Sequence, residues 1–280
     1  MRALILFLVF TLTVAAQDLS LPGDLTAGSD LTLKSPGDGT LYLTGPGTAV
    51  KRELKSGEDV TIAGEHLRHS GMYFAVVKQG SSVRSHKFFV APAAAADISF
   101  LARPSRVPVS APDAIRGTAF VFDQYANLVT VPAPVKFELS VQGGGQFSQT
   151  VTTRDGVAWV KASSGRTQGA AQFVASTGTA SVRRVVQQTA AEPCNLRMRV
   201  QAQGKDLVVE TDPIRDCSGN PVPDGTIVTF IQSGRNGRST VDARVKRGVA
   251  KATLPSVPGS TLSVASGVVL GNEIRWGGGL

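Results

Sequence analysis

Hydrophobic and polar residues alternate in short runs along much of the chain. Between positions 30 and 90 we identify such runs at 30–34, 40–43, 60–62, 72–77 and 85–90. Because successive side chains of a strand point to opposite faces, these runs fit strands with one buried side. Glycine and proline clusters, such as 35–39, mark turns between them. Helical periodicity is missing after position 16, so the pattern predicts an all-β protein.

The N-terminus has a different pattern. Arg2 precedes an apolar run over 3–14, and the small residues Ala15 and Ala16 follow. This is the layout of a secretory signal peptide, which we place at 1–16. The run is shorter than the roughly 20 residues of a transmembrane helix, so we expect no membrane-spanning segment in the mature chain. We therefore expect an exported protein that is periplasmic, on the cell surface or extracellular; an uncleaved N-terminal anchor is the alternative.

Two short joints rich in proline and alanine, at 90–96 and 189–193, divide the remaining chain. They predict domains at 17–92, 97–190 and 193–280. Proline limits the freedom of both joints, so we expect an elongated arrangement.

The second and third segments resemble each other. The stretch 122–129 precedes a strand pattern at 135–139, as 216–222 precedes 226–230. Further on, 155–158 and 171–176 correspond to 247–250 and 261–266. Each copy has a polar turn with Asn, a strand, a glycine-rich loop, a hairpin turn with Gly and two more strands. An internal repeat of this kind indicates that each copy is one structural unit.

This repeat resembles the bacterial immunoglobulin-like domain found in tandem in invasins and intimins, over 98–190 and 194–276. In the first segment, 28–33 and 69–75 resemble the second strand of an immunoglobulin domain and the segment entering its sixth strand. The resemblance implies three tandem immunoglobulin-like β-sandwiches, with Tyr73 as the tyrosine corner and Leu33 and Ala75 at the usual cysteine positions. Such modules serve mainly as stalks, and some carry receptor-binding surfaces.

The two cysteines, Cys194 and Cys217, predict a disulfide if the chain is exported. Two free or metal-binding thiols are the alternative. The formal net charge is +8, but the basic residues are scattered and aromatic residues make up 6% of the chain. This composition indicates a cationic surface and, together with export, no nucleic-acid partner.

Three histidines are candidates for catalysis or metal binding. His66, His69 and His86 all lie in the first predicted domain, where no Gly-x-Ser-x-Gly motif accompanies them. The spacing of His66 and His69 matches neither the common zinc-protease motif nor its inverse. We expect these histidines to be polar residues of turns. A hydrolase that uses the first domain is the least favoured hypothesis for the function.

Acidic residues are few and dispersed, so no carboxylate pair for glycoside hydrolysis can be named. Asp212, Asp216 and Asn220 recur every four positions, as calcium ligands could, but they lack the twelve-residue calcium-loop order. Asp and Asn in turns usually bond their own backbone. We predict no catalytic, cofactor-binding or metal site.

One loop is a candidate for binding. Arg235 and Arg238 flank an Asn236-Gly turn, which predicts a hairpin tip where two guanidinium groups can bind a carboxylate or phosphate. A solvated turn without function is the alternative. Tyr125, Trp159 and Trp276 are the candidates for a sugar-stacking platform, although a place in the core or in a strand is more typical of tryptophan.

Together these features predict a non-enzymatic secreted or cell-envelope protein, structural or interacting, that binds another protein or a surface polymer through immunoglobulin-like domains. The alternative is a carbohydrate-binding accessory protein, which requires an exposed row of aromatic side chains on one sheet. Neither the partner nor the oligomeric state follows from the sequence.

Overall fold

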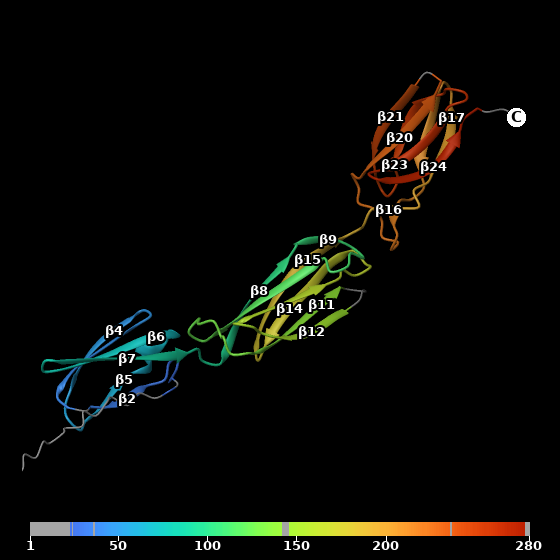
Figure 1. Ribbon diagram of the computed structural model, residues 1–280. Coiled ribbons are helices and arrows are strands. Elements are labelled where there is room, and N and C mark those ends of the chain that lie inside the picture. The colour runs from blue at the N-terminus through green and yellow to red at the C-terminus, as the bar shows by residue number, and fades with distance from the viewer. Residues whose placement is uncertain (1–22, 24, 36, 142–145, 236, 278–280) are drawn as a thin grey trace, which may run out of the picture. The chain divides into compact units, whose positions relative to one another are not determined.

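The computed structural model describes residues 23, 25–35, 37–141, 146–235 and 237–277. The predicted signal peptide at 1–16 lies outside these residues, as does Asn236. The described elements are strands and one 3₁₀ turn, so the all-β prediction is confirmed (Figure 1). The described part contains no helix that is long and apolar enough to cross a membrane.

The first set of strands forms a five-stranded sheet, in the order β1-β7-β6-β3-β4, and a two-stranded sheet, β2-β5. The inward side chains of both sheets form one buried cluster that includes Leu31, Leu43 and Ile62. Leu33 and Ala75, the implied cysteine positions, are buried in it. The elements are β1 (Leu25–Thr26), β2 (Leu31–Lys34), β3 (Gly39–Gly45), β4 (Thr48–Leu54), β5 (Asp59–Ile62), η1 (Gly64–Leu67), β6 (Gly71–Gln79) and β7 (Ser82–Ala91).

The second set forms sheets of order β13-β10-β8 and β12-β11-β14-β15-β9. Phe100 and Phe173 meet edge to face in its core, with ring centroids 5.0 Å apart. A Cβ atom on Gly117 would lie 2.7 Å from the Phe173 ring, so any larger residue here has to displace that ring. The strands are β8 (Ala95–Arg103), β9 (Arg106–Pro108), β10 (Ile115–Asp123), β11 (Pro134–Val141), β12 (Gln146–Thr152), β13 (Val157–Ala162), β14 (Gly169–Thr177) and β15 (Ala180–Thr189).

The third set forms a small sheet, β16-β19, and two larger ones, β17-β18-β22 and β21-β20-β23-β24. Leu207 and Val209 from one large sheet and Phe230 and Leu262 from the other belong to one buried cluster. The strands are β16 (Pro193–Cys194), β17 (Met198–Gln203), β18 (Asp206–Thr211), β19 (Arg215–Asp216), β20 (Ile227–Gly234), β21 (Gly237–Arg244), β22 (Lys251–Pro255), β23 (Thr261–Ser266) and β24 (Val269–Arg275).

By spatial proximity the chain divides into two compact units. The first comprises 1–95 together with 122–130, and the second comprises 96–121 with 131–280. The segment 122–130 belongs to the first unit because Tyr125 packs against the core of the first strand set. The domain bounds 17–92, 97–190 and 193–280 stay a prediction.

Candidate functional site

The histidines do not assemble a catalytic set. His66 lies in η1, with its Nε2 3.8 Å from the carboxylate of Glu65. His69 supplies a backbone carbonyl to Tyr73, and the buried Nε2 of His86 has no hydrogen-bond partner in the described part of the chain. Among the described residues, neither His66 nor His69 bonds a serine side chain. The geometry of the histidines therefore gives no support to the hypothesis of a hydrolase.

Tyr73 occupies the place that the family resemblance implies. Its ring is fully buried and stacks on Phe88, with centroids 5.6 Å apart. Its hydroxyl donates a 2.9 Å hydrogen bond to the carbonyl of His69, four residues upstream. A buried tyrosine normally finds such a partner, and this bond fixes the chain as it enters β6.

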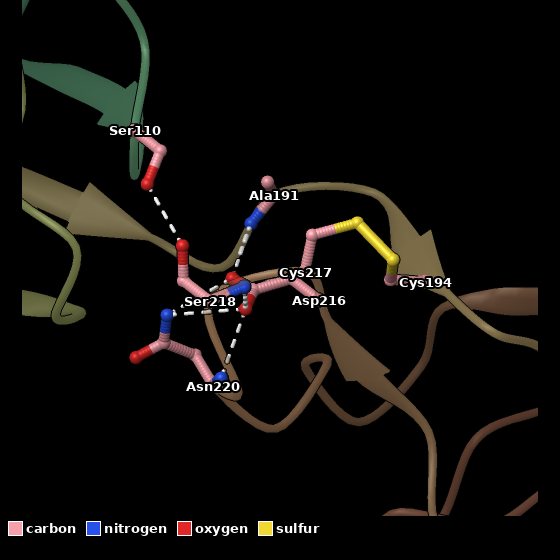
Figure 2. Close-up of a disulfide and its surroundings, with 7 residues drawn as sticks. All are labelled: Ser110, Ala191, Cys194, Asp216, Cys217, Ser218 and Asn220. Carbon is pink, nitrogen blue, oxygen red and sulfur yellow. Dashed lines mark hydrogen bonds between the residues drawn. A yellow bond between two sulfur atoms is a disulfide. The ribbon is translucent and has the colours of Figure 1, made fainter.

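The predicted cysteine pair is bridged, because Cys194 in β16 and Cys217 after β19 form a disulfide (Figure 2). Their sequence separation is 23 residues. The bridge ties the short β16-β19 ladder, in which Cys194 lies opposite Arg215. Its role is therefore structural.

Beside the disulfide, the polar turn of the internal repeat is organised by a buried aspartate (Figure 2). The carboxylate of Asp216 accepts hydrogen bonds from the backbone N–H groups of Ala191 at 3.0 Å, Ser218 at 2.9 Å and Asn220 at 2.9 Å. The side-chain amide of Asn220 donates another at 3.0 Å. Burial raises the pKa of Asp216, but these hydrogen bonds outweigh it, so the pKa lies below its ordinary value.

The equivalent turn in the first unit repeats this pattern. The Asp123 carboxylate accepts hydrogen bonds from the backbone N–H groups of Ala93, Tyr125 and Asn127, and from the Asn127 side chain. Burial raises the pKa of Asp123 as well. The hydrogen bonds, of which that from the Asn127 side chain has the largest effect, outweigh burial, so the pKa of Asp123 lies below its ordinary value. Both turns therefore use a charged carboxylate to satisfy backbone donors.

The two asparagines also bond segments far away in sequence. The Asn127 side chain donates to the carbonyl of Arg68 and accepts from the N–H of Ser70. The Asn220 side chain likewise donates to the Arg166 carbonyl and accepts from the Gln168 N–H. These bonds explain the spacing of Asp216 and Asn220, whereas Asp212, the third residue of the calcium-like pattern, forms a 2.8 Å ion pair with Arg199. The described ranges hold no group of three or more His, Cys, Asp or Glu suited to a metal ion.

The arginine loop lies where the hairpin signal placed it. β20 and β21 pair up to Gly234 opposite Gly237, and the exposed Arg235 and Arg238 flank this tip. Arg238 borders a groove of ≈ 240 Å³ that Val257 also lines. Asn236 lies outside the described residues, and the role of the loop stays a prediction.

The three candidate sugar-stacking residues do not share a sheet. Tyr125 packs against the first core, with the guanidinium carbon of Arg68 5.9 Å from its ring centre. Trp276 packs against the third core and donates from Nε1 to Ser256. Trp159, on β13, is 63% exposed. The row of aromatic side chains that the carbohydrate alternative requires is therefore not formed by these residues.

A surface that the sequence analysis missed lies on the outer side of the five-stranded sheet. Met72 on β6 is directly opposite Phe89 on β7, and Tyr42 on β3 is directly opposite Val76 on β6. Phe74 lies between these pairs on β6. Four of the five side chains are 40–50% exposed, and Val76 is half-buried. We call these five residues the aromatic face.

The aromatic face is unusual because its strands already have a complete inner side. Leu41, Leu43, Tyr73, Ala75 and Val77 point into the core from β3 and β6. The outward positions therefore need no apolar residue for folding. Single exposed apolar side chains are ordinary, but neighbouring ones on one face mark interaction surfaces.

Basic side chains border the aromatic face. Lys87 on β7 lies opposite Phe74, and Lys51 on β4 lies opposite Tyr42. Lys51 forms a 2.9 Å ion pair with Glu53, also on β4. Glu53 is the only carboxylate at this border among the described residues, and it is already paired with Lys51. The net charge of the border is therefore positive.

Comparisons with known proteins agree on the fold. No protein-family model and no curated protein sequence matches the chain. Among solved structures, the Escherichia coli adhesin FdeC is similar with a TM-score of 0.61 and 17% identity, over 97% of this chain and 100% of that one. Invasin, a bacterial integrin-binding protein, has a TM-score of 0.52 and 13% identity, over 93% and 60%. InvD of Yersinia pseudotuberculosis has a TM-score of 0.51 and 13% identity, over 94% and 97%.

These likenesses show that the chain has the fold of tandem bacterial immunoglobulin-like domains. The fold is the one that the resemblance of the repeat implied.

Proposed function

We propose that this chain is a non-enzymatic interaction protein, exported to the cell envelope or beyond, that binds another protein through the aromatic face. The observation that carries the proposal is the set of neighbouring exposed apolar side chains on β3, β6 and β7. Similarity to adhesin structures and the disulfide support a surface role outside the cytoplasm.

The composition of the face suits protein recognition. Aromatic residues and Met are enriched in the buried centres of protein interfaces, whereas Lys is depleted there. In the face, Met72, Phe74 and Phe89 are neighbours, and the lysines Lys87 and Lys51 lie beside Phe74 and Tyr42. Burying one Phe side chain stabilises a complex by roughly 1.5–3 kcal/mol. Because Phe74 and Phe89 are already about half buried, with 44% and 50% exposed, burying the rest of both rings contributes about 1.5–3 kcal/mol together.

The positive charge at the border of the aromatic face indicates which charge the partner carries. Glu53 is paired with Lys51, so the remaining border charge is positive. The partner expected here is a protein with an apolar patch edged by carboxylates, since complementary charge favours encounter and register. A second copy of the chain would carry the same net positive border, which disfavours self-association through this face.

The test is partner capture with paired variants of the mature chain. The face variant is Phe74→Ser with Phe89→Ser, and the control is Val268→Ser with Leu270→Ser, which removes two more exposed apolar side chains, 82% and 79% exposed, from another strand set. Proteins retained from an envelope extract of the source cells are identified, and the dissociation constant of each purified partner is measured for both variants.

We expect a saturable partner whose affinity falls about tenfold or more for the face variant and is unchanged for the control. Equal retention by both variants would overturn the role of the face. Self-association of the purified chain in sedimentation, lost in the face variant, would replace the acidic partner with a second copy.

A further inference from the structure

A second surface lies along one side of the second strand set, where two strands each have an open edge. Among the described strands, β12 pairs only with β11, and β13 pairs only with β10. Between these edges runs a groove of ≈ 520 Å³, lined by Gln149, Val151, Thr152, Arg154 and the stretch 157–161 of β13. Its volume falls in the range of roughly 300–1,000 Å³ that is typical of small-molecule sites.

Trp159 is the large apolar side chain of this groove. It is 63% exposed, while its neighbours Ala158 and Val160 are buried and supply the contacts of β13 with the core. Across the ladder it faces Thr118, which offers no aromatic partner. An indole ring left so exposed contributes little to folding, and its flat face is available to stack against a ligand.

The charged side chains that line the groove are all basic. Arg154 and Lys161 line it, and Arg116 lies directly opposite Lys161 on β10. No acidic side chain is among the lining residues, and these three cations form no ion pair with any described residue. Gln149 and Thr152 add neutral hydrogen-bonding groups. The groove therefore combines one stacking ring, uncharged donors and acceptors, and cations that form no ion pair among the described residues.

We propose that this groove binds an anionic glycan. A sugar ring stacks on the indole of Trp159, and a carboxylate or phosphate of the sugar pairs with Arg154 and Lys161. Hydroxyl groups bond the side chains of Gln149 and Thr152. A single aromatic ring among polar groups suits a sugar, whereas the aromatic face has the neighbouring apolar side chains of a protein interface.

A neighbouring groove adds to the surface available to a longer glycan. Lys161 borders a second groove of ≈ 340 Å³, which Phe147, Ser163 and Asp113 also line. A polymer can therefore continue past Lys161 along the same open edges. Asp113 disfavours negative charge in this second groove, so the anionic groups are expected near Arg154 and Lys161. This site is independent of the protein-binding function proposed above.

The test uses calorimetric titration of the mature chain with four probes: oligogalacturonate, phosphomannan, neutral mannan and polyglutamate. The variants are Trp159→Ala and Arg154→Gln with Lys161→Gln. The matched control is Arg183→Gln with Arg184→Gln, which removes two exposed arginines from β15. Because Trp159 points outward, its variant should melt at the temperature of the unaltered chain.

We expect saturable binding of oligogalacturonate or phosphomannan that weakens as salt increases. Binding should fall about tenfold or more in both groove variants and remain in the control. The better anionic glycan identifies whether the charge is a carboxylate or a phosphate. The proposal would be overturned if neither anionic glycan bound, if Trp159→Ala bound as tightly as the unaltered chain, or if polyglutamate bound more tightly than the glycans.

Discussion

Replacing Asp216 by alanine tests whether the buried carboxylate organises the repeated turn. In the unaltered chain the carboxylate accepts three backbone hydrogen bonds. The bond from the N–H of Asn220 is buried, and the bonds from Ala191 and Ser218 are partly buried. A buried donor left without a partner costs about 1–3 kcal/mol, and each partly buried bond contributes about 0.5–1.5 kcal/mol. We therefore expect Asp216→Ala to lower the free energy of unfolding of the third strand set by about 3 kcal/mol.

The assay is urea unfolding followed by the fluorescence of Trp276, which packs against the third core. A Trp159→Phe background removes the other tryptophan. The matched control is Asp212→Ala, which removes a carboxylate whose ion pair with the largely exposed Arg199 is worth about 0–1 kcal/mol. If Asp216→Ala costs no more than this control, the carboxylate does not hold the turn.

The same carboxylate predicts a pH dependence of stability. The pKa of Asp216 is lower in the folded chain than its ordinary value, so the unfolded chain binds the proton more tightly. Its stabilising contribution is therefore present above the unfolded pKa of about 3.9 and is lost as the pH falls through the folded pKa. The difference in unfolding free energy between the unaltered chain and Asp216→Ala should be constant near neutral pH and shrink below about pH 4. A difference that stays constant down to the folded pKa would refute this explanation.

Three further changes test the remaining structural features. Tyr73→Phe removes one buried hydrogen bond and should cost about 1 kcal/mol in urea unfolding of the first strand set. Cys194→Ser with Cys217→Ser opens a disulfide of separation 23 and should cost about 3 kcal/mol, measured by the Trp276 signal. Gly117→Ala places a methyl group against the Phe173 ring and should cost about 1–3 kcal/mol in thermal melting, whereas no change would show that the ring moves freely.

The sequence predicted the strands well where alternation was genuine. The run at 30–34 corresponds to β2, where Leu31 and Leu33 are buried and Thr32 and Lys34 are exposed. The run at 72–77 does not alternate, because all six of its residues are apolar. Both sides of β6 are consequently apolar, and Met72 and Phe74 face outward. Such a run is the signal that predicts the aromatic face, but only the sheet order shows that Phe89 and Tyr42 join it.

The repeated turn shows a different limit of sequence reasoning. The spacing of Asp216 and Asn220 correctly indicates a turn, in which the Asp216 carboxylate bonds local backbone N–H groups and the Asn220 side chain bonds that carboxylate. It does not reveal the bonds from Asn220 to Arg166 and Gln168, which are more than fifty positions away. Contacts between segments so distant depend on how the chain folds back, and local spacing carries no information about that. Trp159 is similar, because the sequence predicts a place in the core or in a strand, but its exposure depends on which face of β13 points away from the core.

The inner and outer positions of these strands separate folding from recognition. On β6 and β13 the inward residues, such as Tyr73 and Val160, form the cores, while outward residues such as Phe74 and Trp159 leave them almost untouched. A substitution at an outward position can therefore change binding with little effect on stability, and one at an inward position has the opposite consequence. This division makes both proposed surfaces testable with folded variants.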